Sequence, residues 1–157
     1  ISGSRAFGAA GLTALALALA VPFIASPTVA APPGVQVTVE ITNLRSHDGV
    51  VRACMTRDEE RFPRCQDSTQ GYRVVVPAGE ATTLRFRDVA PGTYAIALLH
   101  DENDNGRADR ALGMMPREGF GFSRDAPVRM GPPDFEDAAI SVGTSPLRQT
   151  IRMRYML

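Results

Sequence analysis

The sequence contains no tryptophan and no lysine, and it has only two cysteines and two histidines. The absence of tryptophan excludes the antibody signature, in which a tryptophan packs on a disulfide. The absence of lysine means that all 17 basic residues are arginine, which we interpret as codon bias from a GC-rich genome. These arginines are interspersed with 17 acidic residues, so no basic stripe for nucleic acid is present.

Common catalytic motifs are also missing. Ser123 lies in "GFS" and not in a G-x-S-x-G elbow. Neither His47 nor His100 has a sequence pattern that links it to a nucleophile. We therefore expect a protein that is not an enzyme.

The first thirty residues differ in composition from the rest of the chain. Arg5 is the only charged residue before Glu40, residues 9–21 are almost entirely apolar, and "TVAA" follows two prolines. This order is typical of a secretory signal peptide, and it predicts cleavage after Ala30. The apolar run is too short for a comfortable membrane span, and the prolines that follow it, Pro22 and Pro27, also argue against a transmembrane anchor. No cysteine lies at the predicted cleavage site, which argues against a lipoprotein. We expect residues 1–30 to be a signal peptide and 31–157 to be one periplasmic or secreted domain.

Export bears on the two cysteines, Cys54 and Cys65, which both lie in the predicted mature domain. A pair at short spacing outside the cytoplasm usually forms a disulfide. Such a bond would contribute about 3 kcal/mol in the chain-entropy model. The alternative is a metal or redox pair. The missing CxxC spacing and the lack of a nearby histidine argue against it.

Seven short segments have the composition of strands, and most of them alternate apolar and polar residues with a period of two. They cover residues 35–42, 50–55, 72–77, 82–89, 94–100, 138–142 and 147–155. The fifth segment is apolar on both faces, which predicts a central strand. Turn signals separate the segments, and no amphipathic helix is evident. The pattern predicts an all-β chain, an antiparallel β-sandwich of immunoglobulin-like or prealbumin-like class, with one long loop between strands five and six.

The stretch "HDENDNGRAD", residues 100–109, follows the predicted central strand and is rich in side-chain oxygens. With Asp101 as position 1, it matches the start of the calcium-loop pattern D-x-[DN]-x-[DN]-G. Position 12 is Leu112, so a closing carboxylate must come from elsewhere, and Glu118 is favoured over Asp134, Glu136 and Asp137. The candidate calcium ligands are Asp101, Asn103, Asn105, the carbonyl of Arg107, Asp109 and Glu118. A series of Asx turns without an ion explains the same residues equally well.

The connection between residues 113 and 137 is long for a compact domain and rich in glycine and proline. Loops of this length are usually functional or disordered. Its aromatic residues, Phe120, Phe122 and Phe135, either anchor the loop on the sandwich or form a surface for a ligand or partner.

The run "GTYAIALLHDENDNGRADRALGMMPREGFGFSRDAP", followed by "GPPDFEDAAISV", resembles the bacterial domain-of-unknown-function family 2141. The matching positions are His100, Asp101, Asn103, Asn105, Gly106, Asp109, Gly113, Pro116, Glu118, Gly119, Gly121, Phe122, Ser123, Pro133, Phe135, Asp137 and Ala138. The resemblance covers nearly all of the predicted mature chain. It implies an exported bacterial β-sandwich, and it brings no activity.

These observations favour an exported, non-enzymatic module with a binding or structural role at the cell envelope. Its partner would be an envelope protein or a glycan, with no nucleic acid and no transmembrane span after the signal is removed. The alternative is a carboxylate-dependent hydrolase or carbohydrate-active enzyme that uses Asp101, Glu118 or Asp137. Carboxylates with raised pKa values in one pocket would favour that alternative.

Overall fold

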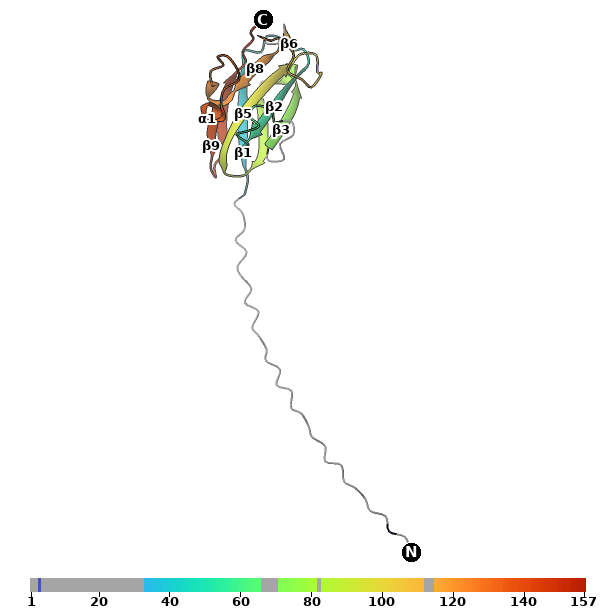
Figure 1. Cartoon of the computed structure of the whole chain (residues 1–157), viewed down its shortest axis with the longest axis vertical. Coiled ribbons are helices and arrows are strands. Elements are labelled where there is room, and N and C mark those ends of the chain that lie inside the picture. Colours follow the sequence, from blue (N-terminus) through green and yellow to red (C-terminus); the bar gives the residue numbers. More distant parts are fainter. Residues whose placement is uncertain (1–2, 4–32, 66–70, 82, 112–114) are drawn as a thin grey trace. The chain divides into compact units, whose positions relative to one another are not determined.

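The structure is a computed structural model that describes residues 3, 33–65, 71–81, 83–111 and 115–157. The chain divides into two units, Ile1–Ala30 and Ala31–Leu157, and the strands and helices that the structure describes belong to the second (Figure 1). Apart from Gly3, the predicted signal peptide lies outside the described residues. In the described part of the chain, no helix is long and apolar enough to cross a membrane.

One sheet of the domain has three strands in the order β10-β1-β4. They are β1 (Val35–Thr42), β4 (Thr83–Val89) and β10 (Leu147–Arg152). β1 pairs antiparallel with β4, as expected, but parallel with β10. The prediction of an antiparallel sandwich is therefore wrong for this pair. The chain crosses from the second sheet, which contains β9 (Ala139–Val142), to the edge of β1 before it forms β10. The sequence could not predict this parallel pairing, because apolar–polar alternation along a strand does not depend on the direction of the neighbouring strand.

The second sheet contains five strands, with β5 at its centre. They are β2 (Val50–Thr56), β3 (Gly71–Pro77), β5 (Gly92–Asp101), β8 (Gly119–Phe122) and β9 (Ala139–Val142). β5 pairs with β2 along one edge and with β8 and β9 along the other. The prediction of a central strand covered on both faces is confirmed, since residues 94–98 of β5 are all buried.

Short elements complete the domain. β6 (Arg110–Ala111) and β7 (Met115–Pro116) form a separate two-stranded ladder. Single turns of helix occur as η1 (Ala78–Glu80), η2 (Ser123–Asp125) and α1 (Phe135–Ala138). The predicted all-β class is confirmed, since the two sheets pack as a sandwich with almost no helix.

The main core lies between the two sheets and uses the inward residues of the alternating strands. Full burial of such side chains contributes roughly 1.5–3 kcal/mol each. The largest fully buried side chains are Tyr94, Phe86, Met55, Leu84, Ile96, Ile151, Met153, His100, Val37, Val39, Val51 and Val89.

A second, smaller apolar cluster covers the outer face of the β5 sheet. It includes Ala97, Phe122 and Phe135, with Phe62 packed against it. The disulfide between Cys54 and Cys65 fastens the segment that carries Phe62, with the two Cα atoms 6.0 Å apart. The predicted disulfide is therefore present in the structure.

β8 is a strand that the periodicity of the sequence did not predict. Its four residues, "GFGF", are all buried, with phenylalanines on one face and glycines on the other. A Cβ on Gly119 would lie 2.3 Å from the ring of Tyr155, so the glycine face allows the C-terminal segment to pack closely. Phe120 and Arg154 exchange backbone hydrogen bonds of 3.0 and 2.8 Å, which joins the two sheets along this side.

Candidate functional site

Asp101, the last residue of β5, begins the candidate calcium loop and is fully buried. One of its carboxylate oxygens accepts a hydrogen bond from the backbone N–H of Asn105 (3.0 Å). The other accepts from the N–H of Gly106 (2.8 Å) and from Nε of Arg52 (2.6 Å). Burial alone would raise the pKa of Asp101, but these three donors together lower it. Asp101 is therefore held as a carboxylate that closes the turn.

Arg52 is a site residue that the sequence analysis did not single out. It projects from the outer face of β2 and bonds both Asp101 and Asp104. In the ladder Arg52 is the partner of Leu99, so Asp101 lies two residues further along the same face of β5. The alternation of residues in the sequence predicted that Arg52 points outward. It did not predict which residue of β5 lies opposite Arg52.

The middle of the loop is a series of Asx turns. Oδ1 of Asn103 accepts from the N–H of Asn105 (3.2 Å), and Oδ1 of Asn105 accepts from the N–H of Arg107 (2.8 Å). Both side-chain amides donate to the same oxygen of Asp109, at 2.8 and 2.9 Å. The structure thus joins the side chains of Asn103, Asn105 and Asp109 in one hydrogen-bonded turn.

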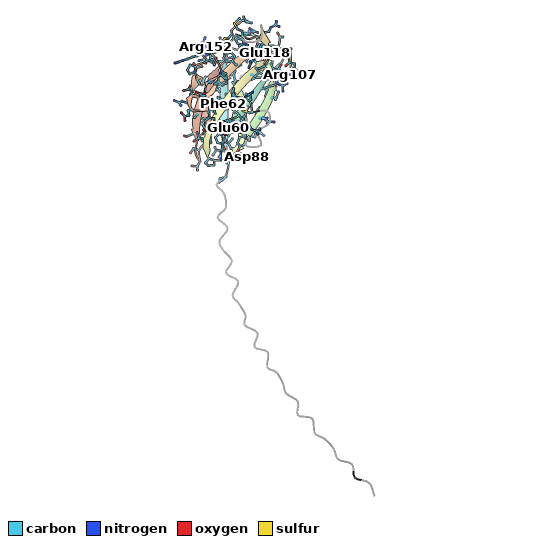
Figure 2. All side chains as sticks on the ribbon, in the orientation of Figure 1. Glu60, Phe62, Asp88, Arg107, Glu118 and Arg152 are labelled. Carbon is cyan, nitrogen blue, oxygen red and sulfur yellow. A yellow bond between two sulfur atoms is a disulfide. The ribbon has the colours of Figure 1, made fainter. Side chains whose placement is uncertain are left out.

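Glu118 is the long-range carboxylate that reaches this loop. Its Oε2 accepts the backbone N–H of Asp109 (3.0 Å), while its Oε1 is buried without a hydrogen-bond partner. Burial raises the pKa of Glu118, and the charges of Asp101, Asp109 and Glu102 raise it further, against the lowering effect of the Asp109 N–H. Glu118 and Arg107 lie at the same end of the domain, away from Asp88 (Figure 2).

The other three acidic residues considered for closing the loop lie around α1. Asp134 and Asp137 line a surface cavity together with the proline-rich segment 131–133, and Glu136 is exposed. Among the described residues, none of these three side chains forms a hydrogen bond or ion pair with Asp101, Asn103, Asn105 or Asp109. Glu118, which the sequence analysis favoured, is the one that meets Asp109.

A second network ties this end of the domain to the C-terminus. Arg45 pairs with Glu102, donates to the carbonyl of Arg117 (3.0 Å) and stacks over the ring of Tyr155. The hydroxyl of Tyr155 lies 2.8 Å from Nδ1 of the buried His100. Both Arg45 and Tyr155 therefore position the strand ends that flank the loop, and the sequence carried no signal for either.

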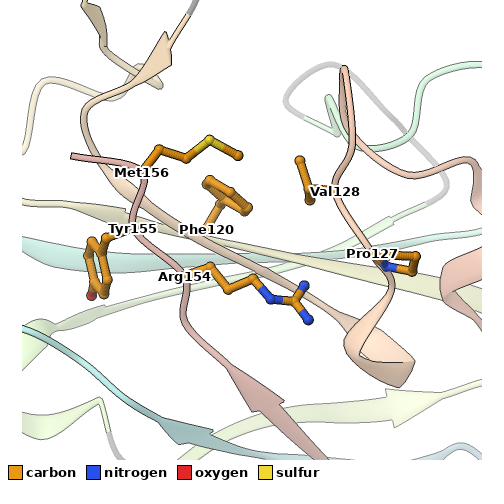
Figure 3. Close-up of a pocket in the computed structure, with 6 residues that line it drawn as sticks. All are labelled: Phe120, Pro127, Val128, Arg154, Tyr155 and Met156. Carbon is orange, nitrogen blue, oxygen red and sulfur yellow. The ribbon is translucent and has the colours of Figure 1, made fainter.

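The three phenylalanines of the long connection are all buried. Phe122 and Phe135 pack edge to face against Phe62. Phe120 also forms part of a surface groove of about 470 Å³, shown in Figure 3. The groove is lined by Phe120, Pro127, Val128, Arg154, Tyr155 and Met156. Neither this groove nor the cavity beside α1 is lined by Asp101 or Glu118.

Comparison with protein families identifies a match over residues 39–150, to a family described as "Uncharacterized protein conserved in bacteria (DUF2141)". No curated protein and no solved structure matches the chain at a significant level. The matched region runs from within β1 to within β10 and includes the whole candidate site. It confirms the resemblance drawn from the sequence, and the chain belongs to this family of uncharacterised bacterial proteins.

Proposed function

We propose that the protein is an exported, non-enzymatic β-sandwich module with a binding or structural role at the cell envelope, whose 101–109 loop binds calcium together with Glu118. The observation that carries the calcium proposal is the buried, unpaired Oε1 of Glu118. An ionised carboxylate that is buried without a partner is costly. A bound divalent cation would supply the missing partner.

The charges and ligand types around Glu118 fit a hard cation. Glu118 accepts the backbone N–H of Asp109, and the charges of Asp101 and Asp109 raise the pKa of Glu118. Calcium prefers carboxylate, amide and carbonyl oxygens, and it accepts six to eight of them in flexible geometry. Arg52 already pairs with Asp101, so we assign most of the charge at the ion to Asp109 and Glu118.

Calcium binding requires a local rearrangement of the two asparagines. Both amides donate N–H groups to Asp109 in the structure. A half-turn of each amide would exchange nitrogen for oxygen and present two neutral ligands to an ion beside Asp109. The rearrangement gives up the two Asx turns, which is consistent with the modest affinity that extracellular modules usually have.

Export is supported by the pattern of residues 1–30 and by the disulfide. A covalent Cys54–Cys65 bond persists in oxidising compartments and is rare in the cytosol. A periplasmic or secreted protein would also meet calcium at millimolar concentration more readily than a cytosolic one.

Thermal unfolding in chelator and in about 1 mM calcium tests the proposal. With a dissociation constant of about 0.1 mM, calcium adds roughly 1.4 kcal/mol of stability. The melting temperature should rise by several degrees. Asp109→Asn should remove most of this rise. Asp104→Asn is the matched control, because Asp104 lies in the same loop but outside the proposed ligand set. Superimposable wild-type melts with and without calcium would show that the loop is an Asx network alone.

A further inference from the structure

The outer face of the three-stranded sheet carries four exposed arginines, and we call it the arginine face. Arg85 and Arg87 lie on β4, and Arg148 and Arg152 lie on β10. The alternate residues of the same strands, such as Phe86, are buried in the core. The four guanidinium groups therefore project on the side of the sheet that faces away from the second sheet.

Most of the positive charge on the arginine face is unpaired. The side chains of Arg85, Arg87 and Arg152 form no hydrogen bond or ion pair with any described residue. Of the four, only Arg148 has a partner within the described part of the chain, Glu40 on β1 at 3.2 Å. Exposure of these two side chains is 76% and 49%, so water screens the pair and it contributes little to stability.

The ladder register sets the arginines in two rows on either side of β1. Thr38 on β1 is the Cα partner of Arg85 on one side and of Arg148 on the other, and Thr42 is the partner of Arg152. Adjacent strands are about 4.8 Å apart, so the two rows are about 10 Å apart. β1 carries threonine, glutamine and glutamate outward, and all of these are shorter than the arginines that flank it.

The chemistry of the face favours a partner recognised by charge. The outward positions of the three strands carry no aromatic or large aliphatic side chain, so neither sugar rings nor bases can stack there. Insertion into a lipid layer would need such apolar groups as well. Electrostatic membrane binding usually needs four to eight basic residues, and only three here are free. Arginine binds carboxylates through two parallel hydrogen bonds, which suits a polymer with regularly spaced carboxylates.

We propose that the arginine face binds a linear acidic polysaccharide, whose chain lies along β1 with arginines of β4 and β10 on both sides. This inference rests on the proposed binding role at the cell envelope and names the class of molecule that is bound. It uses a surface separate from the calcium loop, so either proposal can fail without the other. Experiments in chelator keep the two apart and prevent calcium from bridging the protein and the polymer.

Binding of the purified protein to immobilised polygalacturonate, in chelator and at low ionic strength, tests the proposal. Dextran is the neutral control. Retention should fall steeply as salt is added. The double variant Arg85→Gln/Arg87→Gln should lower the affinity about tenfold, since each exposed ion pair contributes up to about fivefold. Arg64→Gln/Arg129→Gln removes the same charge at two exposed positions outside the three strands and should have little effect. Glu40→Gln should raise the affinity, because it frees Arg148.

Three results would overturn the inference. Equal losses from the two double variants would mean that only net charge matters. Weaker binding by Glu40→Gln would contradict the assigned path along β1. Binding to phosphatidylglycerol vesicles with none to polygalacturonate would identify a membrane surface in place of a polymer. Melting curves of all variants in the same buffer would establish that each one is folded.

Discussion

Replacing Glu118 by glutamine should make the cation-free protein more stable at neutral pH. The wild-type carboxylate is 5% exposed, and one of its oxygens has no partner. Glutamine has nearly the same shape and keeps an oxygen that can accept the N–H of Asp109. Glutamine is also uncharged, so it avoids the repulsion from Asp101, Asp109 and Glu102 that raises the pKa of Glu118.

The size and the sign of this effect follow from burial. An unpaired buried acceptor costs about 1–3 kcal/mol, and more when it is charged. The pKa of Glu118 is raised above its ordinary value of 4.5. At a pH between these two values, Glu118 is protonated in the folded protein but ionised in the unfolded chain. Wild-type stability therefore falls as the pH rises through the window between 4.5 and the raised pKa. The glutamine variant lacks this loss.

Thermal unfolding in chelator at pH 4 and pH 7 measures the effect. We expect Glu118→Gln to match the wild type at pH 4. At pH 7 it should melt higher by roughly 3–5 °C for each kcal/mol gained. Glu60→Gln, at an exposed position, should change neither value. In calcium the order should reverse or narrow, since the variant loses a ligand. An advantage of equal size at both pH values, or none at pH 7, would refute the argument from the unpaired carboxylate.

Three other changes test the architecture. Cys54→Ser/Cys65→Ser should lower the unfolding free energy in urea by about 3 kcal/mol, and reduction of the wild type should have the same effect. Gly119→Ala should cost roughly 1–3 kcal/mol because its Cβ would meet an aromatic ring at 2.3 Å, whereas Gly131→Ala, with no atom within 4 Å, should be neutral. Asp101→Asn should lose about 1.5–3 kcal/mol at pH 7, since Asp101 has a lowered pKa, and the loss should shrink as the pH falls below its ordinary value of 3.8. An equal loss at pH 7 and pH 2 would contradict that assignment.

The alternation of apolar residues was sufficient to locate the main strands. The pattern in "VQVTVEIT" predicted β1 over the same residues that the structure assigns to it, Val35–Thr42. Alternation works there because one face of the strand is buried and the other meets water. The same reasoning missed β8, since both of its faces are covered and glycine on one of them replaces the polar residues that would mark a solvent face.

The sequence likewise predicted one part of the candidate site, the loop, but did not decide which carboxylate closes it. The oxygen-rich spacing from Asp101 to Asp109 and the glycine between them identified the loop, because Asx turns and calcium loops both depend on residues close in sequence. The sequence offered four alternative carboxylates to close the loop. Only the structure decided the choice of Glu118, because the pairing of β8 with β5 places its side chain at the N–H of Asp109.

The sequence by itself determined the all-β class, the positions of most strands, the disulfide pair, the family and the composition of the loop. These depend on local periodicity, on residue spacing and on a specific run of motifs. Only the tertiary structure decided the parallel pairing of β1 with β10, the capture of Asp101 by Arg52, and the setting of arginines on both sides of β1. Each of these joins residues that are dozens of positions apart. Such contacts depend on strand order and register, which arise from the packing of the whole domain and leave no periodic trace in the chain.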